Sequence, residues 1–263
     1  MRIFLFLVFS LLVCLAESSI TDIENLANCV KNNDEKCIKA LLLKKNDLIN
    51  AKTKTINDKL SQPAEKCLIY FTGVANPEES FNESMFDLLV SQGIKVYCDD
   101  FLPFFIVGNQ NVSDKKTLKI LKMMKKEGLD LGITKEIIGL FSQDFRLIIQ
   151  SAMANKMYTF EYIVKNGGKN EFYEGAGTII IINHYELVKR FIDNDETKIK
   201  AFFKSREYKN FVKNELEFIE IFVKNSSGGD ELKGLKNLFF HPKMKKYYDE
   251  ETYEKIALLI KQK

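Results

Sequence analysis

Histidine is scarce in this chain of 263 residues, which contains only His184 and His241. Serine and cysteine nucleophiles are usually activated by a neighbouring base, and neither histidine has the serine–glycine or cysteine context of a catalytic elbow. We interpret His184 as a structural residue in the turn before a helix. We interpret His241 as the end of a helix, where a cationic ring suits the helix dipole. The sequence therefore predicts no catalytic residue and a protein that is not an enzyme.

Metal and cofactor motifs are missing as well. The chain has no CxxC pair, and its two histidines lie far from its cysteines, so the spacing of a zinc site is absent. Gly175-Ala176-Gly177 comes nearest to a phosphate-binding loop, but it opens a predicted helix without a preceding strand or a following Lys-Ser or Lys-Thr. We predict neither a metal nor a cofactor.

The sequence has one long apolar run, from Ile3 to Ala16, interrupted only by Ser10. It is shorter than the roughly 20 residues that a spanning helix needs. A basic residue precedes the run, and Cys14 and Ala16 place small residues where signal peptidase cuts, so residues 1–16 are predicted to be a signal peptide. An uncleaved anchor or a buried N-terminal helix is the alternative. We expect no membrane span after cleavage, and a protein that is secreted, periplasmic or in the lumen of the secretory pathway.

An excess of one charge is also lacking, because 39 basic residues face 36 acidic residues. Loss of Arg2 with the signal peptide leaves a net charge of +2. So balanced a chain is not expected to bind nucleic acid or an anionic membrane as its main partner. A lysine cluster between Lys115 and Lys126 has the spacing of a solvated helix face.

Four cysteines follow the predicted signal peptide, all in the first third of the chain. In an oxidising compartment they allow two disulfides in three connectivities. We favour a pair across one helical hairpin and a second, longer-range pair; four free buried thiols are the alternative. The favoured pairs are Cys29 with Cys37, and Cys67 with Cys98.

An apolar pattern recurs along the chain. Apolar residues lie at i, i+3 and i+4, which is one face of an α-helix, and a Gly or Asn follows that suits the left-handed end of a helix. Gly93, Gly128 and Gly167 end three such segments. Because one helical hairpin cannot bury its apolar face alone, repetition indicates stacked hairpins. We predict an all-α fold, an α-solenoid. The clearest stripes are Ile38, Leu41 and Leu42; Met85, Leu88 and Leu89; Ile120, Met123 and Met124; and Phe160, Ile163 and Val164.

These segments resemble the ankyrin-repeat family, in degenerate form. Phe160–Gly168 looks like the family's second helix with its Asn-Gly ending, and Asn183–Ile192 is similar to its turn-and-helix segment. Ile38–Asn50 matches a helix followed by Asp-apolar-Asn, and Leu102-Pro103-Phe104 stands where the family has Thr-Pro-Leu. No complete Thr-Pro-Leu-His motif occurs, and the loops before Phe81 and after Gly128 are enlarged.

The resemblance implies ankyrin-like repeats over residues 20–194, followed by helical hairpins over 195–263 that are further repeats or a cap. Another α-solenoid or an irregular helical bundle is the alternative fold. The implied function is binding of a protein partner, by a monomer, through a concave face and through the loops Asn76–Asn82 and Gly108–Asp114. The sequence does not identify that partner.

Three alternatives to this function stay open: an enzyme that uses clustered carboxylates, a secreted effector that acts on a host protein, and a structural component of a cell envelope. We interpret the acidic clusters as solvated helix surface, helix-start acids and turn residues. The acids concerned are Glu215, Glu217 and Glu220; Asp249, Glu250 and Glu251; and Asp99 and Asp100.

Asn-x-Ser/Thr sequons begin at Asn82, Asn111 and Asn225. They are glycosylation candidates if the chain enters a eukaryotic secretory pathway. Each lies in a predicted loop or helix start. Ser113, the third residue of one sequon, is instead interpreted as the cap of the helix that begins at Asp114.

Overall fold

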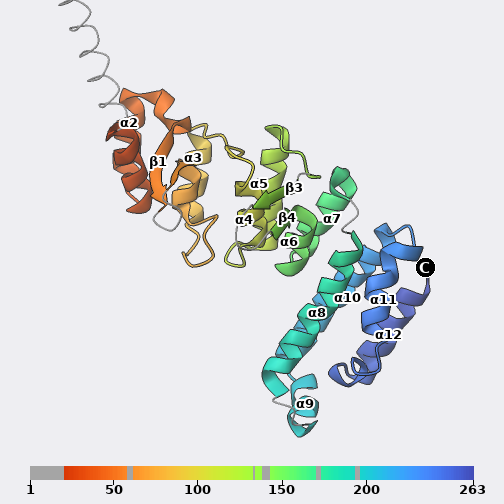
Figure 1. The fold of residues 1–263 in the computed structure, drawn as a ribbon. Helices are drawn as coiled ribbons and strands as arrows, with labels where there is room; N and C mark the ends of the chain where they lie inside the picture. The colour runs from red at the N-terminus through yellow and green to blue at the C-terminus, as the bar shows by residue number, and fades with distance from the viewer. Residues whose placement is uncertain (1–20, 58–61, 133, 138–142, 170–172, 193–195) are drawn as a thin grey trace, which may run out of the picture. The chain divides into compact units, whose positions relative to one another are not determined.

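A computed structural model describes residues 21–57, 62–132, 134–137, 143–169, 173–192 and 196–263. The predicted signal peptide, residues 1–16, lies outside the described residues. The described chain is mostly helical (Figure 1), as the apolar stripes predict. It divides into two compact units, Met1–Val112 and Ser113–Lys263, called unit 1 and unit 2 below.

Unit 1 begins with a helical pair and continues through a β-hairpin to two further helices. Local signals fix the helix starts. Asp34 accepts a hydrogen bond from the backbone N–H of Cys37, Asn82 accepts one from Met85, and Pro103 occupies the first turn of its helix. The elements are a helix over 21–31, α2 (Glu35–Lys44), η1 (Asn46–Asn50), β1 (Lys52–Asn57), β2 (Gln62–Cys67), η2 (Leu68–Thr72), α3 (Glu83–Ser91) and α4 (Leu102–Gly108).

Two disulfides lie in unit 1. The structure joins Cys29 to Cys37, with 5.8 Å between their Cα atoms, and Cys67 to Cys98, with 6.4 Å between theirs. Both are the pairs that the sequence favours. The first links the helix over 21–31 to α2, and the second ties the end of β2 to the segment before α4.

Unit 2 begins with one helix and a β-hairpin and continues as a series of helices. Ser113 caps the first helix, as expected, by accepting a hydrogen bond from Lys116. The elements are α5 (Asp114–Lys126), β3 (Thr134–Ile137), β4 (Gln143–Arg146), α6 (Leu147–Met153), α7 (Met157–Ile163), η3 (Val164–Gly168), α8 (Tyr173–Ile192), α9 (Glu196–Phe203), α10 (Arg206–Asn225), η4 (Gly229–Leu232), α11 (Lys233–Phe239), η5 (Lys245–Tyr247) and α12 (Glu250–Lys261).

Aromatic side chains form much of the core of unit 2. Tyr173 of α8 stacks on Phe222 of α10, with 4.4 Å between ring centroids, and Phe160 of α7 meets Phe218 edge to face at 4.9 Å. Gly177 lets α8 approach α10 closely, because a Cβ there would lie 2.5 Å from the ring of Phe222. Helices α6 and α11 also pack on α8.

The glycines after the apolar stripes confirm the prediction about helix ends. Gly93, Gly128 and Gly167 have φ angles of +89°, +108° and +101°. These angles are in the region that L-residues with a Cβ rarely adopt. The helices α3, α5 and α7 therefore end where the Gly-containing pattern indicates.

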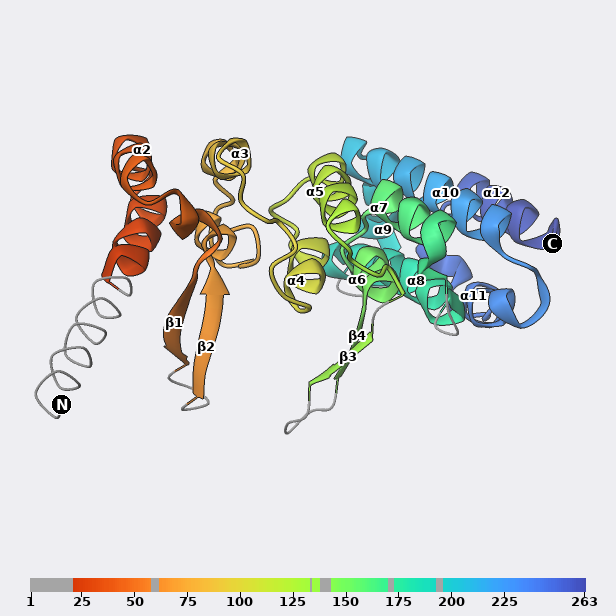
Figure 2. The ribbon, with the colours of Figure 1, turned by 90° about the horizontal axis from the view of Figure 1, so that it is seen from above.

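Two antiparallel β-hairpins depart from the all-α expectation. β1 pairs with β2 in unit 1, and β3 pairs with β4 in unit 2. Figure 2 shows each hairpin extending from the helices of its own unit. They occupy two stretches in which the sequence predicts loops or turns. The alternating Lys and Thr of Lys52–Thr55, with Ile56, is a short β-pattern.

One further expectation is wrong, and another is wrong at a single residue. His184 does not lie in a turn before a helix: α8 runs unbroken through it, because Asn183 donates to the carbonyl of Ala152 in α6 instead of capping a new helix. The lysine cluster is a solvated face at Lys115, Lys119, Lys122 and Lys126, as predicted, but Lys116 is only 7% exposed and its side chain lies in the interior of unit 2. His184 and Lys116 are placed by tertiary contacts.

None of the helices in the described part of the chain is both long enough and apolar enough to cross a membrane.

Candidate functional site

His184 and Glu215 meet inside unit 2. Both side chains are buried, and the Nδ1 atom of His184 lies 2.6 Å from Oε2 of Glu215. The Nε2 atom of His184 lies 2.8 Å from the carbonyl oxygen of Tyr247. Tyr248 stacks on the imidazole at 3.7 Å between centroids, and its hydroxyl donates to Oε1 of Glu215 at 3.0 Å. Glu215 is therefore not the solvated surface residue that its spacing indicates.

The partners of His184 fix how many protons the pair holds. A carbonyl oxygen only accepts, so Nε2 of His184 carries a hydrogen. Nδ1 and the carboxyl of Glu215 then need a further proton between them, carried by the ring or by the carboxyl. Either form leaves the pair neutral overall, so no uncompensated charge is buried. All the polar atoms of this pair are engaged and shielded, which supports a structural role for His184.

Tyr208 and Asp249 connect this buried cluster to the surface of unit 2. The backbone N–H of Asp249 donates to the hydroxyl of Tyr208 at 3.2 Å. Burial is the main cause that raises the pKa of Tyr208 well above its ordinary value. Burial also acts to raise the pKa of Asp249, but hydrogen bonds from Thr252 and Tyr208 outweigh it and hold that pKa below its usual value. Asp249 is thus an ionised helix cap with a fixed orientation.

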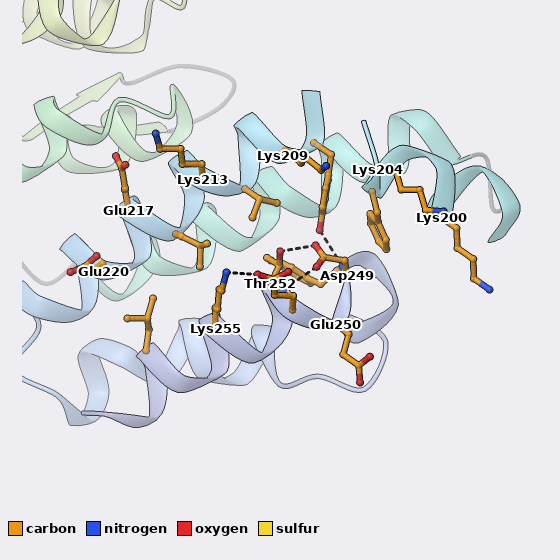
Figure 3. A pocket seen from close by; sticks show the side chains of 17 residues that line it. Lys200, Lys204, Lys209, Lys213, Glu217, Glu220, Asp249, Glu250, Thr252 and Lys255 are labelled. Atoms are coloured by element: carbon orange, nitrogen blue, oxygen red, sulfur yellow. Dashed lines mark hydrogen bonds and ion pairs between the residues drawn. The ribbon is translucent and has the colours of Figure 1, made fainter. Parts of the chain in front are cut away.

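A groove lies above this cluster, between α10 and α12, with α9 at one end (Figure 3). It encloses about 960 Å³. We call it the α10–α12 groove. Its floor is apolar and aromatic, and part of that floor is half-buried, at Phe203, Leu216 and Leu259. The floor consists of Phe203, Tyr208, Val212, Leu216, Tyr248 and Leu259.

Four lysines border one half of the groove. Lys200 lies on α9, Lys204 directly follows it, and Lys209 and Lys213 lie one turn apart on α10. All four are exposed. Among the described residues, no carboxylate forms an ion pair with any of them. The α9–α10 side of this part of the groove therefore carries positive charge that is open to a partner, opposite the acids at the start of α12.

The acids of the groove are distributed differently. Asp249 caps α12 by accepting from the backbone N–H and hydroxyl of Thr252. Glu251 is paired with Lys255 along the same helix. Glu217 and Glu220 lie farther along α10, toward its C-terminal end. Glu250, the first residue of α12, is exposed and borders the lysine-rich half from the opposite wall (Figure 3). The groove thus has one half in which lysines of α9 and α10 face the acids at the start of α12 and, along α10, an acidic half.

The sequence alone did not reveal this groove. Lys209 and Lys213 have the i, i+4 spacing of an ordinary solvated helix face, and their residue types carry no further signal. Only the packing of α12 against α10 sets them beside an apolar floor. The sequence did place Asp249 and Glu250 at a helix start, which the structure confirms.

The two loops chosen from the sequence as contact sites lie together in unit 1. The side-chain amide of Asn109 donates to the carbonyls of Gly73 and Val74, and that of Asn111 donates to Pro77 at 2.7 Å. Asn109 also donates to the carbonyl of Asn76, and Asn111 to that of Glu79. Residues 109–111 are therefore bonded to the loop 76–82 within unit 1.

A second cavity, of about 1150 Å³, opens beside these loops. Lys31 lies over the ring of Phe71 at 4.9 Å, and Lys66 lies over Tyr70 at 5.9 Å. These two lysines therefore already have partners within unit 1. The hydroxyl of Tyr70 donates to Asp99 at 3.0 Å.

Asp99 and Asp100 act in the turn before α4, as their position indicates. Asp99 accepts from the backbone N–H groups of Phe101 and Leu102 at 2.8 and 2.9 Å. Asp100 accepts from the hydroxyl of Tyr97 at 2.6 Å. Their hydrogen bonds are those of turn and cap residues.

The three sequon asparagines all use their amide nitrogen, which is the atom that glycosylation would modify. Asn82 donates to Asn33 at 3.1 Å, Asn111 donates to Pro77 as described, and Asn225 donates to Ile221 at 2.8 Å. A glycan on Asn111 would have to replace its bonds to the loop 76–82. Glycosylation at these positions remains a prediction.

Cys67, Cys98 and Asp99 form the one group in the described part of the chain whose ligand atoms lie close enough together to hold a metal ion. Metal binding by cysteine requires the thiolate. Because the two sulfurs are joined in a disulfide, this group does not offer that ligand set.

The fold and the groove define a class: a mostly helical, disulfide-containing protein with an apolar groove bordered by charge. Comparisons with protein-family models, with curated proteins and with solved structures gave no match to this chain.

Proposed function

We propose that this chain is an exported protein-binding module of degenerate ankyrin-like repeats, and that the α10–α12 groove is its main contact surface. The observation that carries the proposal is the groove itself, whose apolar floor is accessible at half-buried side chains and lies between charged rims. Such a combination fits the apolar face of a protein segment, with polar contacts around its edge.

Two further observations support the proposal. Disulfides persist in oxidising compartments, so the pairs Cys29–Cys37 and Cys67–Cys98 favour an exported protein. The ankyrin unit consists of a β-turn and two helices, and the β3–β4 hairpin followed directly by α6 and α7 has that order. The left-handed glycines after α3, α5 and α7 agree with repeated helix ends.

Two adjacent leucines of α12 provide the test. Leu259 lines the groove, whereas Leu258 is 62% exposed and does not line it. The purified chain and the variants Leu259→Glu and Leu258→Glu would each be used to capture partners from extracellular or lumenal fluid. We expect Leu259→Glu to lose a partner that the wild type and Leu258→Glu both retain.

Circular dichroism would check that both variants fold. If Leu259→Glu does not fold, Leu259→Ala would replace it as the milder change. A partner retained equally by all variants would contradict the groove as the contact surface.

A further inference from the structure

The four lysines beside the groove narrow the kind of partner that fits it. Lys200, Lys204, Lys209 and Lys213 border the half of the groove that runs from α9 along the first half of α10 (Figure 3). A uniform polyanion does not fit the whole groove, because Glu217 and Glu220 border the next stretch of α10. The groove thus favours a partner whose charge changes along its length.

The dimensions favour a helix. Between Tyr208 and Glu220, α10 rises about 18 Å, which corresponds to about three turns of an α-helix laid alongside it. Val212 and Leu216 lie one turn apart on α10, and Leu259 approaches from α12. An amphipathic helix with apolar residues at i, i+3 or i+4, and i+7 matches a groove walled by two helices.

We propose that the occupant of the α10–α12 groove is an amphipathic helical segment of a protein, acidic over the half that meets the four lysines. This rests on the proposed function and names the chemistry of the partner. Acidic side chains of the partner pair with lysines that have no described carboxylate partner. The other half of the segment is neutral or basic, opposite Glu217 and Glu220.

Three synthetic helical peptides of equal length provide the probes. The first has an apolar stripe with glutamates in one half and lysines in the other. The second has the same stripe with lysines throughout, and the third has the composition of the first with its stripe scrambled. Fluorescence anisotropy with the full chain should show binding of the first probe, and at least about tenfold weaker binding of the other two.

Charge reversal in the protein should have opposite effects on the affinity for the first probe and on the affinity for the all-lysine probe. Lys209→Glu/Lys213→Glu should weaken binding of the first probe at least about tenfold and strengthen binding of the all-lysine probe. Lys198→Glu/Lys243→Glu makes the same change in net charge at exposed lysines that do not line the groove. It should leave both affinities within about twofold. Lys209→Gln/Lys213→Gln replaces the first variant if that variant fails to fold.

The proposal is overturned if the all-lysine probe binds as tightly as the first probe, if the lysine variants bind the first probe as wild type does, or if no probe binds. If capture of a partner still depends on Leu259 in that case, the proposed function stands and only the acidic helical occupant is wrong. If the first probe binds but Leu259→Glu captures every partner of the wild type, the groove recognises such a helix and is not the main contact surface.

Discussion

Lys156 shows how one buried side chain makes stability depend on pH. Its ammonium donates to the hydroxyl of Thr117 at 2.7 Å, and the side chain is buried at the start of α7. Burial lowers the pKa of Lys156 from 10.5 to about 7, although the nearby carboxylate of Asp114 acts to raise it. The unfolded chain therefore holds a proton on Lys156, between pH 7 and 10.5, that the folded chain has lost.

We predict that Lys156 makes the free energy of unfolding rise with pH across that window, because the unfolded state binds more protons there. In Lys156→Met this contribution is absent, so any stability advantage of the variant over wild type should shrink between about pH 7 and about pH 9.5. Urea denaturation followed by circular dichroism at several pH values measures it. Lys119→Met, at an exposed position on α5, is the control. A constant difference across the window would contradict the prediction.

Asp114 illustrates a residue whose role depends on distant partners. The sequence places it correctly at the start of α5, after the cap Ser113. The structure adds that its carboxylate accepts from the backbone N–H of Tyr158 and from the N–H and hydroxyl of Thr159. It thereby satisfies the exposed N–H groups of α7 as well. Sequence spacing could not reveal this, because the residues are more than 40 positions apart.

At the scale of elements, glycines at helix ends and inside helices have opposite roles. Gly128 follows α5 with φ +108°, and no atom outside its immediate neighbours in the chain lies within 4 Å of the position that an added Cβ would take. Gly175 lies in the first turns of α8, where an added Cβ would make only an ordinary contact, 3.6 Å from Ile149. Backbone conformation alone therefore decides the effect of adding a methyl group at Gly128.

Gly128→Ala should destabilise the chain by about 1–2 kcal/mol, because alanine is strained at that φ. Gly175→Ala should stabilise it by about 0.5–1 kcal/mol, because glycine weakens a helix interior. Midpoints of urea unfolding for the two variants measure both effects. If Gly128→Ala does not lower the midpoint, the assignment of Gly128 as a left-handed helix end is wrong. If Gly175→Ala lowers it, the prediction for Gly175 is wrong and that for Gly128 is unaffected.

Elements with a strong local signal were predictable, and those decided by their neighbours were not. The stripe at Ile120, Met123 and Met124 with its terminal glycine gave the end of α5. The break predicted near Asn183 was wrong, because Asn183 bonds to α6 and the buried ring of His184 continues the packed face of α8. The short strands were missed because four to six residues carry too little periodicity to stand out.

At the scale of the whole molecule, the described disulfides are confined to unit 1. Cys67–Cys98 closes a separation of 31 residues, and Cys29–Cys37 closes one of 8. A longer closed loop removes more conformational entropy from the unfolded chain, which corresponds to a stabilisation of about 3.7 kcal/mol for Cys67–Cys98 and about 2.5 kcal/mol for Cys29–Cys37. Unit 1 thus depends on oxidation more directly than unit 2.

We predict that replacing Cys67 and Cys98 by alanine destabilises unit 1 more than replacing Cys29 and Cys37. Hydrogen exchange followed by mass spectrometry measures this, because it reports on peptides of each unit separately. Protection should fall in residues 21–112 and change less in residues 113–263. An equal loss in both units, or a larger effect of the shorter loop, would contradict the prediction.

The sequence by itself determined most helix segments, their capped starts and their glycine ends, and it favoured one cysteine pairing out of three. These follow from interactions within a few residues or, for the cysteines, from a very small set of candidates. Tertiary structure alone decided that Glu215 is buried against His184, and that Lys209 and Lys213 border an apolar groove. The reason is that burial and pairing depend on which helix packs alongside, and a helix face has the same periodicity whether it meets water, a neighbouring helix or a partner.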